Sequence, residues 1–508
     1  MKKTILSLIL IFTTFIGSAQ EKGLDQKIDE AFAPISEFFT KTIFFEIAGY
    51  PFVILLLIVS AAFFTLFFGF PNLRYFKTAI NVVRGKYDEI EKDDSGSKDG
   101  EVSHFQALAT AVSGTVGNGN IAGVALAIAL GGPGATFWMI ICGLIGMSSK
   151  FVECTLGVKY RDVGEDGTVY GGPMYYLTKG LKEKGFTILG KVAAVFFAIF
   201  CIGGSFGGGN AAQSNQATIV LKQLLGLEST SAGAMIGLVL AILVGIIIIG
   251  GIKRIASVTE KVVPFMALLY LIACLYILSV NFTLVDDAIS LIITEAFNPT
   301  AMGVGGFIGV VMVGFRRAAF SNEAGVGSAS IAHSAVKTKY AASEGLVALL
   351  EPFIDTVVIC TMTALVIIIF NFGGFFEYGG DGMGTVFIDG VPLEGAAITT
   401  KAFEQYIPFS NVFLTISVVL FAVSTMISWS YYGLQSWKYL FGRGRIADLT
   451  YKLIFCLFVI IGSAASMSSI WDFSDAMIFA MVFPNMIGLF FLFPVVKKEL
   501  KKYLSAIK

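Results

Sequence analysis

Glycine and asparagine are concentrated inside one apolar stretch of the chain. Residues 109–123 read ATAVSGTVGNGNIAG. Each glycine in a helix interior costs roughly 1 kcal/mol relative to alanine, and irregular backbone at membrane depth survives only inside protein or around a cavity. We therefore expect a helix that is broken at Gly117–Asn120. Close packing of small residues against a neighbouring helix is the alternative, but it explains only the glycines and not Asn118 and Asn120.

A broken helix exposes backbone groups that can hold charged ligands. The amides of Gly119 and Asn120 would begin the second half-helix, and the positive end of a helix dipole suits a carboxylate. The freed carbonyls near Ser113 and Val116 would suit a small hard cation such as Na⁺. The residues of Gly117–Asn120 are therefore candidate solute contacts, and Ser113 and Val116 are candidate cation ligands.

A second glycine-rich segment, Gly303–Gly314, reads GVGGFIGVVMVG and begins five spans after the first. A transporter built from inverted repeats would place its partner broken helix there. Its candidate solute contacts are Gly305, Gly306 and Phe307. A flexible but continuous packed helix is the alternative for this segment.

Three amides, Asn210, Gln213 and Gln216, follow one another at intervals of three residues inside an apolar span, roughly on one helix face. Uncharged amides in such a span either bind a polar solute or only join helices. Gln213 is the candidate solute contact among them.

Hydroxyl groups recur in a later span, where Ser424, Thr425 and Trp429 occur within six residues. Serine and threonine hydroxyls can ligate Na⁺, and Thr425 and Trp429 share a helix face. Ser424 and Thr425 are thus candidate cation ligands, and Thr425 and Trp429 candidate solute contacts. Alternatively, the hydroxyls bond only to carbonyls of their own helix.

Charged residues inside apolar spans are costly in lipid and should face protein or water. Arg316, Arg317 and Glu323 are expected at the inner end of one span, and Glu351 and Asp355 one turn apart in the next. They could form cytoplasmic gate pairs or serve as structural anchors.

The sequence shows no set of residues that would catalyse hydrolysis. Its only histidines are His104 and His333, and it contains neither an HExxH motif nor a nucleophile elbow. The net charge of zero indicates no nucleic-acid partner. The six cysteines lie in apolar segments without CxxC spacing, which is typical of buried free thiols and calls for neither disulfides nor a metal bound to them. No cofactor is expected apart from Na⁺, or H⁺, as a coupling ion.

The elements that must position these residues are membrane helices. Mean hydropathy is +0.79 and only 14% of residues are charged. Because a helix of about 20 apolar residues crosses the hydrocarbon core and pairs its own backbone, the chain reads as an all-α polytopic membrane protein. We expect eleven spans, at residues 44–70, 103–130, 135–158, 190–220, 232–251, 257–280, 301–322, 342–371, 409–439, 449–467 and 474–495. Short helices on the outer face are expected at 282–297 and 396–406.

The N-terminus resembles a secretory signal, with Lys2 and Lys3, an apolar stretch, and small residues before a cut after Ala19. An uncleaved anchor is the alternative. The expected order begins with a signal peptide at 1–19, an extracytoplasmic segment at 20–43 and an additional helix at 44–70. A cytoplasmic linker at 71–102, a ten-helix core at 103–495 and a basic cytoplasmic tail at 496–508 then follow.

Basic residues predict the orientation, because Lys and Arg favour cytoplasmic loops. Of the 36 Lys and Arg residues, removal of the signal leaves 34. With the mature N-terminus outside and the C-terminus inside, only five of them lie in outer loops and the other 29 lie on the inner side. The five are Lys22, Lys27, Lys41, Lys222 and Lys401. A cell inner membrane protein of this orientation is expected.

Four ordered motifs resemble the alanine or glycine:cation symporter family, the sodium:alanine symporters. They extend over most of the chain, at Gly117–Gly123, Gly171–Tyr176, Phe320–Ser328 and Trp429–Gly433. The resemblance implies a leucine-transporter-like fold of five-plus-five inverted repeats with discontinuous helices. It also implies symport of small neutral amino acids, chiefly alanine and glycine, with Na⁺ and sometimes H⁺.

The neurotransmitter:sodium symporters carry a similar Gly-x-Gly-Asn pattern at their first helix break. This similarity implies a substrate carboxylate at Asn118–Asn120. It also implies one Na⁺ between the carbonyls of Ser113 and Val116 and the hydroxyls of Ser424 and Thr425. The side chain of Asn118 stands where those relatives usually have an apolar residue.

Other functions remain open from the sequence. A proton-coupled amino-acid permease or an exporter is one alternative. A non-transporting membrane sensor or enzyme is another, although it would require an appended soluble domain or a catalytic constellation, and neither is visible.

Overall fold

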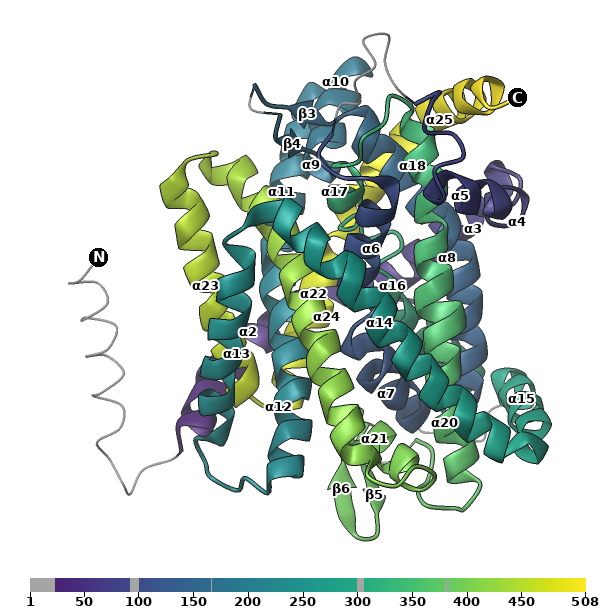
Figure 1. Ribbon diagram of the computed structural model, residues 1–508, viewed down its shortest axis with the longest axis vertical. Helices are drawn as coiled ribbons and strands as arrows, with labels where there is room; N and C mark the ends of the chain where they lie inside the picture. The colour runs from purple at the N-terminus through teal and green to yellow at the C-terminus, as the bar shows by residue number, and fades with distance from the viewer. Residues whose placement is uncertain (1–22, 92–99, 166, 299–305, 380–381, 383) are drawn as a thin grey trace.

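The structure is a computed structural model of the protein, and it describes residues 23–91, 100–165, 167–298, 306–379, 382 and 384–508. The predicted signal peptide and Gly305 lie outside the described residues. The described chain forms a helical bundle, in which the C-terminal helix α25 (Val482–Ala506) ends at the upper end of Figure 1.

Seven continuous helical stretches are long and apolar enough to cross a membrane, and one bent pair makes an eighth. The eight agree with the predicted spans at the same places. They are α6–α7 (His104–Thr115 with Asn118–Gly131), α8 (Gly134–Lys159), α11–α12 (Thr187–Leu225), α14 (Gly251–Val280), α18–α20 (Ala341–Asn371), α22 (Ser410–Phe441), α23 (Arg445–Ala464) and α24–α25 (Met467–Ala506).

Two of the other predicted spans correspond to shorter apolar helices, α3 (Phe52–Phe67) with 16 residues and α13 (Ala232–Ile248) with 17. A span needs about 20 residues to cross the hydrocarbon core, so these two lie at or below the lower limit of length. The third corresponds to α16, whose described part is Gly306–Asn322. The count of eleven and the orientation of the termini therefore stay predictions.

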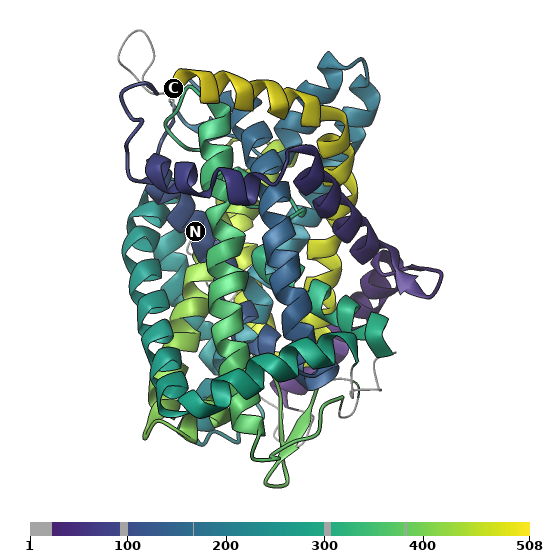
Figure 2. The ribbon, with the colours of Figure 1, turned by 90° about the vertical axis from the view of Figure 1, so that its right-hand side faces the viewer.

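The remaining elements are short or lie at the ends of the bundle. The helix α15 (Phe282–Phe297), predicted correctly, runs across the lower end of the bundle in Figure 2. The helix α21 (Ala396–Glu404), also predicted, lies beside the hairpin of β5 (Val386–Ile388) and β6 (Val391–Leu393). The others are β1–β2 (Glu46–Ile47, Tyr50–Pro51), α4 (Pro71–Arg74), α5 (Phe76–Val83), β3–β4 (Asp162–Val163, Val169–Tyr170), α9 (Pro173–Tyr175), η2 (Tyr176–Gly180), α10 (Leu181–Glu183) and α17 (Ser330–His333).

The segment before the first apolar helix is itself a helix, α2 (Leu24–Ile43). It is amphipathic, so one face is free to bury apolar side chains against the bundle. Phe32 and Phe39 pack edge-on against Phe473 of α24, with ring centroids 5.1 and 6.0 Å apart. The predicted segment 20–43 is therefore a helix attached to the core over its described residues.

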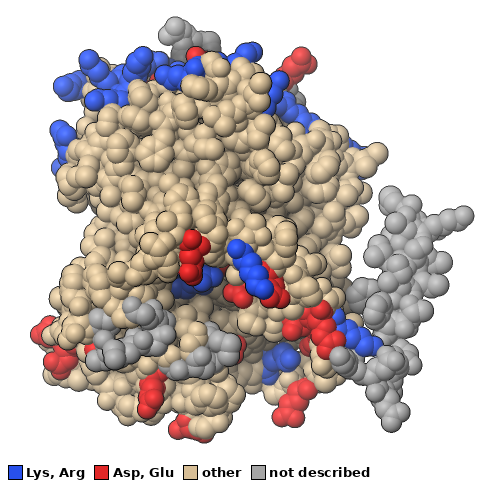
Figure 3. Space-filling model, turned by 180° about the vertical axis from the view of Figure 1, so that it is seen from behind, with Lys and Arg blue, Asp and Glu red and all other residues tan. Residues whose placement is uncertain are grey.

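Charge is distributed unevenly along the long axis of the molecule. On the face drawn in Figure 3, Lys and Arg gather at the upper end, whereas most acidic side chains lie in the lower half. The upper end carries the C-terminus and the start of α6. This distribution agrees with the expectation that the upper end is cytoplasmic.

All six cysteines are free thiols, as predicted.

Candidate functional site

The helix break predicted at Gly117–Asn120 is confirmed. The helix α6 ends at Thr115, residues Asn118–Asn120 form a single 3₁₀ turn, and α7 (Ala122–Gly131) continues at an angle of 56°. The side chain of Asn120 caps the break, because its Oδ1 accepts a hydrogen bond from the Gly117 amide at 2.9 Å. All of these residues are buried, so the irregular backbone is enclosed by protein, as its depth requires.

Gly117 allows α22 to approach the break closely. Its φ of −139° is open to any residue, so its backbone conformation does not require glycine. The requirement is steric: a Cβ atom at this position would lie well inside 3.0 Å of Thr425 Oγ1 and 3.0 Å from Gln213 Oε1.

Oxygen atoms from α6 and α22 converge beside the break. Thr425 Oγ1 donates to the carbonyl of Ser113 at 3.0 Å, and Ser113 Oγ donates to the carbonyl of Ser424 at 2.8 Å. Ser424 Oγ also donates to the carbonyl of Phe421 in its own helix, and Val116 is fully buried beside this set. The predicted oxygens thus come from two helices, and small hard cations prefer such all-oxygen surroundings.

Gln213 contacts the break directly. Its Oε1 accepts from the Asn118 amide at 3.0 Å, and its backbone carbonyl accepts from Asn118 Nδ2 at 3.1 Å. Its Nε2 donates to the Gly208 carbonyl at 2.9 Å. Asn118 Oδ1, by contrast, is buried without a hydrogen-bond partner among the described residues. One of the amides that could hold a carboxylate is therefore occupied by Gln213.

The expectation that three amides share one face is wrong. A π-helical turn, η3 (Gly207–Ala211), precedes α12 (Ala212–Leu225), and the wider turn changes the direction of the side chains. Asn210 Nδ2 donates to the Phe455 carbonyl of α23, whereas Gln216 Oε1 accepts from the Ala396 amide of α21. Only Gln213 reaches the break.

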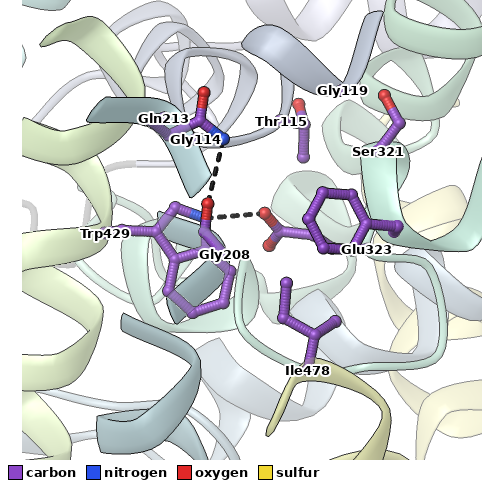
Figure 4. A pocket seen from close by; sticks show the side chains of 10 residues that line it. Gly114, Thr115, Gly119, Gly208, Gln213, Ser321, Glu323, Trp429 and Ile478 are labelled. Carbon is purple, nitrogen blue, oxygen red and sulfur yellow. Dashed lines mark hydrogen bonds between the residues drawn. The ribbon is translucent and has the colours of Figure 1, made fainter. Parts of the chain in front are cut away.

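A small cavity lies beside the break and is shown in Figure 4. Its volume of about 10 Å³ is close to the space that one water molecule needs. Side chains from both helix breaks and from α22 face it. The lining residues are Gly114, Thr115, Gly119, Gly208, Gln213, Phe320, Ser321, Glu323, Trp429 and Ile478.

A second break follows α16. The break predicted at Gly303–Gly314 lies partly outside the described residues, and the described part of that segment, from Gly306, is helix that runs on to Asn322. The chain then leaves the helix over residues 323–329, where Glu323, Gly325 and Gly327 have φ values of 55°, 88° and 94°. Left-handed backbone favours glycine, so Gly325 and Gly327 make this break possible.

The predicted contacts Gly306 and Phe307 are not brought to the cavity. Phe307 is 42% exposed, and its ring packs against those of Trp138 and Phe297. A Cβ atom at Gly306 would have no atom of the described residues within 4 Å.

Glu323 is the main cavity residue that sequence reasoning placed elsewhere. Its Oε1 accepts from Trp429 Nε1 at 2.9 Å, as Figure 4 shows, and its Oε2 accepts from Ser328 Oγ. It has positive φ although it is not glycine, which is uncommon and concentrates at functional sites. Its position inside the quoted Phe320–Ser328 motif was the available signal.

A hydrogen-bonded link joins the two breaks. Asn120 Nδ2 donates to Asp355 Oδ1 at 2.6 Å, and Ser321 Oγ donates to the same oxygen at 3.0 Å. Asp355 lies in the π-helical segment η5 (Phe353–Cys360). Its carboxylate therefore holds the end of α16 and the start of α7 in one arrangement.

Arg316 and Arg317 lie before the break and not at the inner end of a span, because their helix continues past them. Both pair with Asp475 of α24. Phe320 stacks on Trp471 with centroids 5.1 Å apart, and the Arg317 guanidinium lies 5.5 Å from each of these two ring centroids. This layer covers the Phe320 wall of the cavity.

A chain of buried ionisable groups lies on the other side of the site. His104 at the start of α6 lies between Glu91 and Glu344, and His333 lies between Glu344 and Glu351. Glu351 Oε1 is 3.0 Å from Lys150 Nζ in α8. These contacts join α6, α17, α18 and α8. Glu351 is therefore paired with Lys150 and His333, whereas Asp355 accepts hydrogen bonds from residues at the two helix breaks.

Comparison with known proteins gives three findings. The model of the family described as the sodium:alanine symporter family matches residues 36–508. The sodium/alanine symporter AgcS of Methanococcus maripaludis is 39% identical over 89% of this chain and 94% of its own. The probable sodium/glutamine symporter GlnT of Bacillus subtilis is 33% identical over 89% of this chain and 87% of its own.

Among solved structures, a crystal structure of MhsT in complex with L-phenylalanine is similar in fold. It covers 77% of this chain and 89% of its own, with a TM-score of 0.53 and 15% sequence identity. The similarity concerns the fold alone, and it agrees with the expected leucine-transporter-like architecture.

Proposed function

Because the chain belongs to the sodium:alanine symporter family, we propose that it carries small neutral amino acids, alanine or glycine, into the cytoplasm together with Na⁺. The relatives are named as symporters, and the protein is a transporter and not an enzyme. The observation that carries the proposal is the meeting of a cavity and a set of cation-type oxygens at one helix break.

The substrate carboxylate binds at the amides of Asn118–Asn120 in this proposal. Gln213 Oε1 occupies the Asn118 amide in this conformation, so it must move away when the carboxylate arrives. The Glu323 carboxylate on the cavity wall then faces the substrate ammonium. Opposite charges meet both ends of the zwitterion, which suits recognition of an amino acid in a site away from water.

Na⁺ binds between α6 and α22. The carbonyls of Ser113 and Ser424 now accept from the hydroxyls of Thr425 and Ser113. When those hydroxyls rotate, they and the carbonyls all present oxygen lone pairs to the ion. Val116 adds a carbonyl from the end of α6. Binding of Na⁺ therefore stabilises the contact between the two helices and couples the ion to the break.

Small substrates are favoured by the glycines around the cavity. A Cβ atom at Gly208 would lie within 3.0 Å of Ile478, and one at Gly119 would lie 3.3 Å from Ser321 Oγ. Once Gln213 has moved, larger side chains would meet these walls before alanine or glycine would. Glutamine, named for the relative GlnT, is thus the substrate that most directly tests the size limit.

Purified protein in proteoliposomes provides the test. With Na⁺ outside, uptake of labelled alanine or glycine should saturate and exceed that of glutamine. One Na⁺ gains about 2.3 kcal/mol per 100 mV of membrane potential, which supports roughly 40-fold accumulation. Uptake that is unchanged when choline replaces Na⁺, but follows an imposed pH gradient, would replace this proposal with a proton-coupled permease. Export alone would indicate an exporter, and ligand binding without transport would indicate a sensor.

A further inference from the structure

A second cavity of about 420 Å³ opens at the end of the molecule opposite the C-terminus. Its walls come from α2, α12, Glu394 and the connection between α23 and α24. We call it the outer cavity and define it by Asp25, Asp29, Thr218, Lys222, Glu394 and Ser463. Its volume lies in the range typical of small-molecule sites, about 300–1,000 Å³.

Charges of both signs face the outer cavity. Asp25 and Asp29 come from α2, Glu394 precedes α21, and Lys222 lies in the last turn of α12. Lys222 Nζ is 3.9 Å from Asp25 Oδ2, and this lysine side chain is 35% exposed, so the pair is open to a competing ligand. Burial raises the pKa of Asp25, against the opposing effect of hydrogen bonds from the amides of Ala234 and Gly233.

Two buried hydroxyls in the wall have no partner. Thr218 Oγ1 and Ser463 Oγ make no hydrogen bond to any described residue, although the two side chains are only 2% and 5% exposed. Leaving a buried hydroxyl unpaired costs about 1–3 kcal/mol. Both residues line the outer cavity, so a rotation about χ1 would turn either hydroxyl towards a polar molecule bound there.

The outer cavity lies on the same helix as the central site. Gln213 of α12 contacts the break, and Thr218 and Lys222 lie further along the same helix. Between them, Gln216 Oε1 accepts from the Ala396 amide at 3.0 Å, and Asn215 Nδ2 donates to the carbonyl of Gly462. A layer of buried amides thus separates the outer cavity from the break.

We infer that the outer cavity binds a second zwitterionic amino acid, with its carboxylate at Lys222 and its ammonium at Asp25. The choice of alanine as ligand rests on the proposed function. Asp25 and Asp29 precede the family match, which begins at residue 36, so this site is built partly by residues outside that match. The site holds the solute before the amide layer opens towards Gln213.

The test measures how fast a cysteine in the outer cavity reacts with a maleimide. Ile219→Cys, at a partly exposed lining position, is prepared in the full chain in detergent with Na⁺, where the native cysteines are buried except for the partly exposed Cys456. Alanine should slow the reaction by the factor 1 + [L]/Kd, about tenfold at roughly nine times Kd. Ser229→Cys, exposed on the loop beyond α12, is the matched control and should show no protection.

Two added substitutions separate the two sites. Protection should persist with Gly117→Ala, which damages the central site, and should be lost with Lys222→Gln. Protection that disappears with Gly117→Ala, or that is absent in Ile219→Cys itself, would overturn the inference. Met467→Cys, at another partly exposed lining position, and Thr425→Ala replace Ile219→Cys and Gly117→Ala if either fails to fold. Failed alanine uptake by the parent protein refutes the proposed function, whereas the outer cavity is judged by protection alone.

Discussion

Replacing Gly117 with alanine tests the assignment of the helix break most directly. The new Cβ would lie well inside 3.0 Å of Thr425 Oγ1, 3.3 Å from Thr425 Cβ and 3.0 Å from Gln213 Oε1. Because φ is −139°, alanine causes no backbone strain, and the whole effect is steric. Relief requires α22 to move away or Thr425 to leave the carbonyl of Ser113.

The magnitude follows from the cost of overpacking. Inserting one methyl group into a packed site typically costs about 1–3 kcal/mol, which corresponds to roughly 5- to 150-fold in an equilibrium constant. We expect the Na⁺ concentration for half-maximal alanine uptake in proteoliposomes to rise by a factor in this range. Maximal uptake should fall as well, because Gln213 is displaced from the Asn118 amide.

Gly123→Ala is the matched control in the same broken helix. Its Cβ would meet the nearest Trp471 atom at 3.7 Å, an ordinary contact, so uptake should match the parent protein. The double variant Gly117→Ala/Thr425→Ala should recover part of the thermal stability but not the Na⁺ dependence. If Gly117→Ala transports alanine with an Na⁺ requirement within about twofold of the parent, the break is not the coupled site.

Three further predictions concern single side chains. Thr425→Ala should raise the Na⁺ requirement for uptake about tenfold, equivalent to about 1.4 kcal/mol, because the ion loses one oxygen ligand, whereas Thr425→Ser should stay near the parent; equal values for both variants would remove this hydroxyl from the cation site. Phe307→Ala should leave the KM for alanine unchanged, because the Phe307 ring lies on the surface beside Trp138. A raised KM would indicate that Phe307 does contact the substrate. Lys150→Met should lower the free energy of unfolding by about 3–5 kcal/mol, seen as a lower Tm, because Glu351 loses its buried partner; an unchanged Tm would contradict this account.

Much of the fold could be predicted from hydropathy. Eight spans, the bend at Gly117–Asn120 and the helices at 282–297 and 396–404 appear where the pattern placed them. The reason is local: backbone groups in hydrocarbon must be paired within their own helix, so length and polarity already specify a span. Packing of α2 on α24 depends instead on a contact more than 400 residues away.

The second break shows where glycine counting fails. Gly303–Gly314 and Phe320–Ser328 both contain glycines, and the break seen within the described residues falls in the latter, at Gly325 and Gly327. Gly314 instead lets α16 approach α8, since its Cβ would collide with Trp138. Glycine serves close packing and chain reversal alike, so composition does not distinguish the two uses.

The sequence by itself determined that this protein is a bundle of membrane helices with one helix broken at Gly117–Asn120. It also supplied the types of group that could hold a carboxylate and a cation. Only the tertiary structure decided which groups meet there. It brought Gln213, Trp429 and Glu323 to one cavity and left Asn210 and Phe307 outside it. The physical reason is that periodicity specifies a face within one helix, whereas π-helical turns, breaks and the packing of distant helices decide what each face meets.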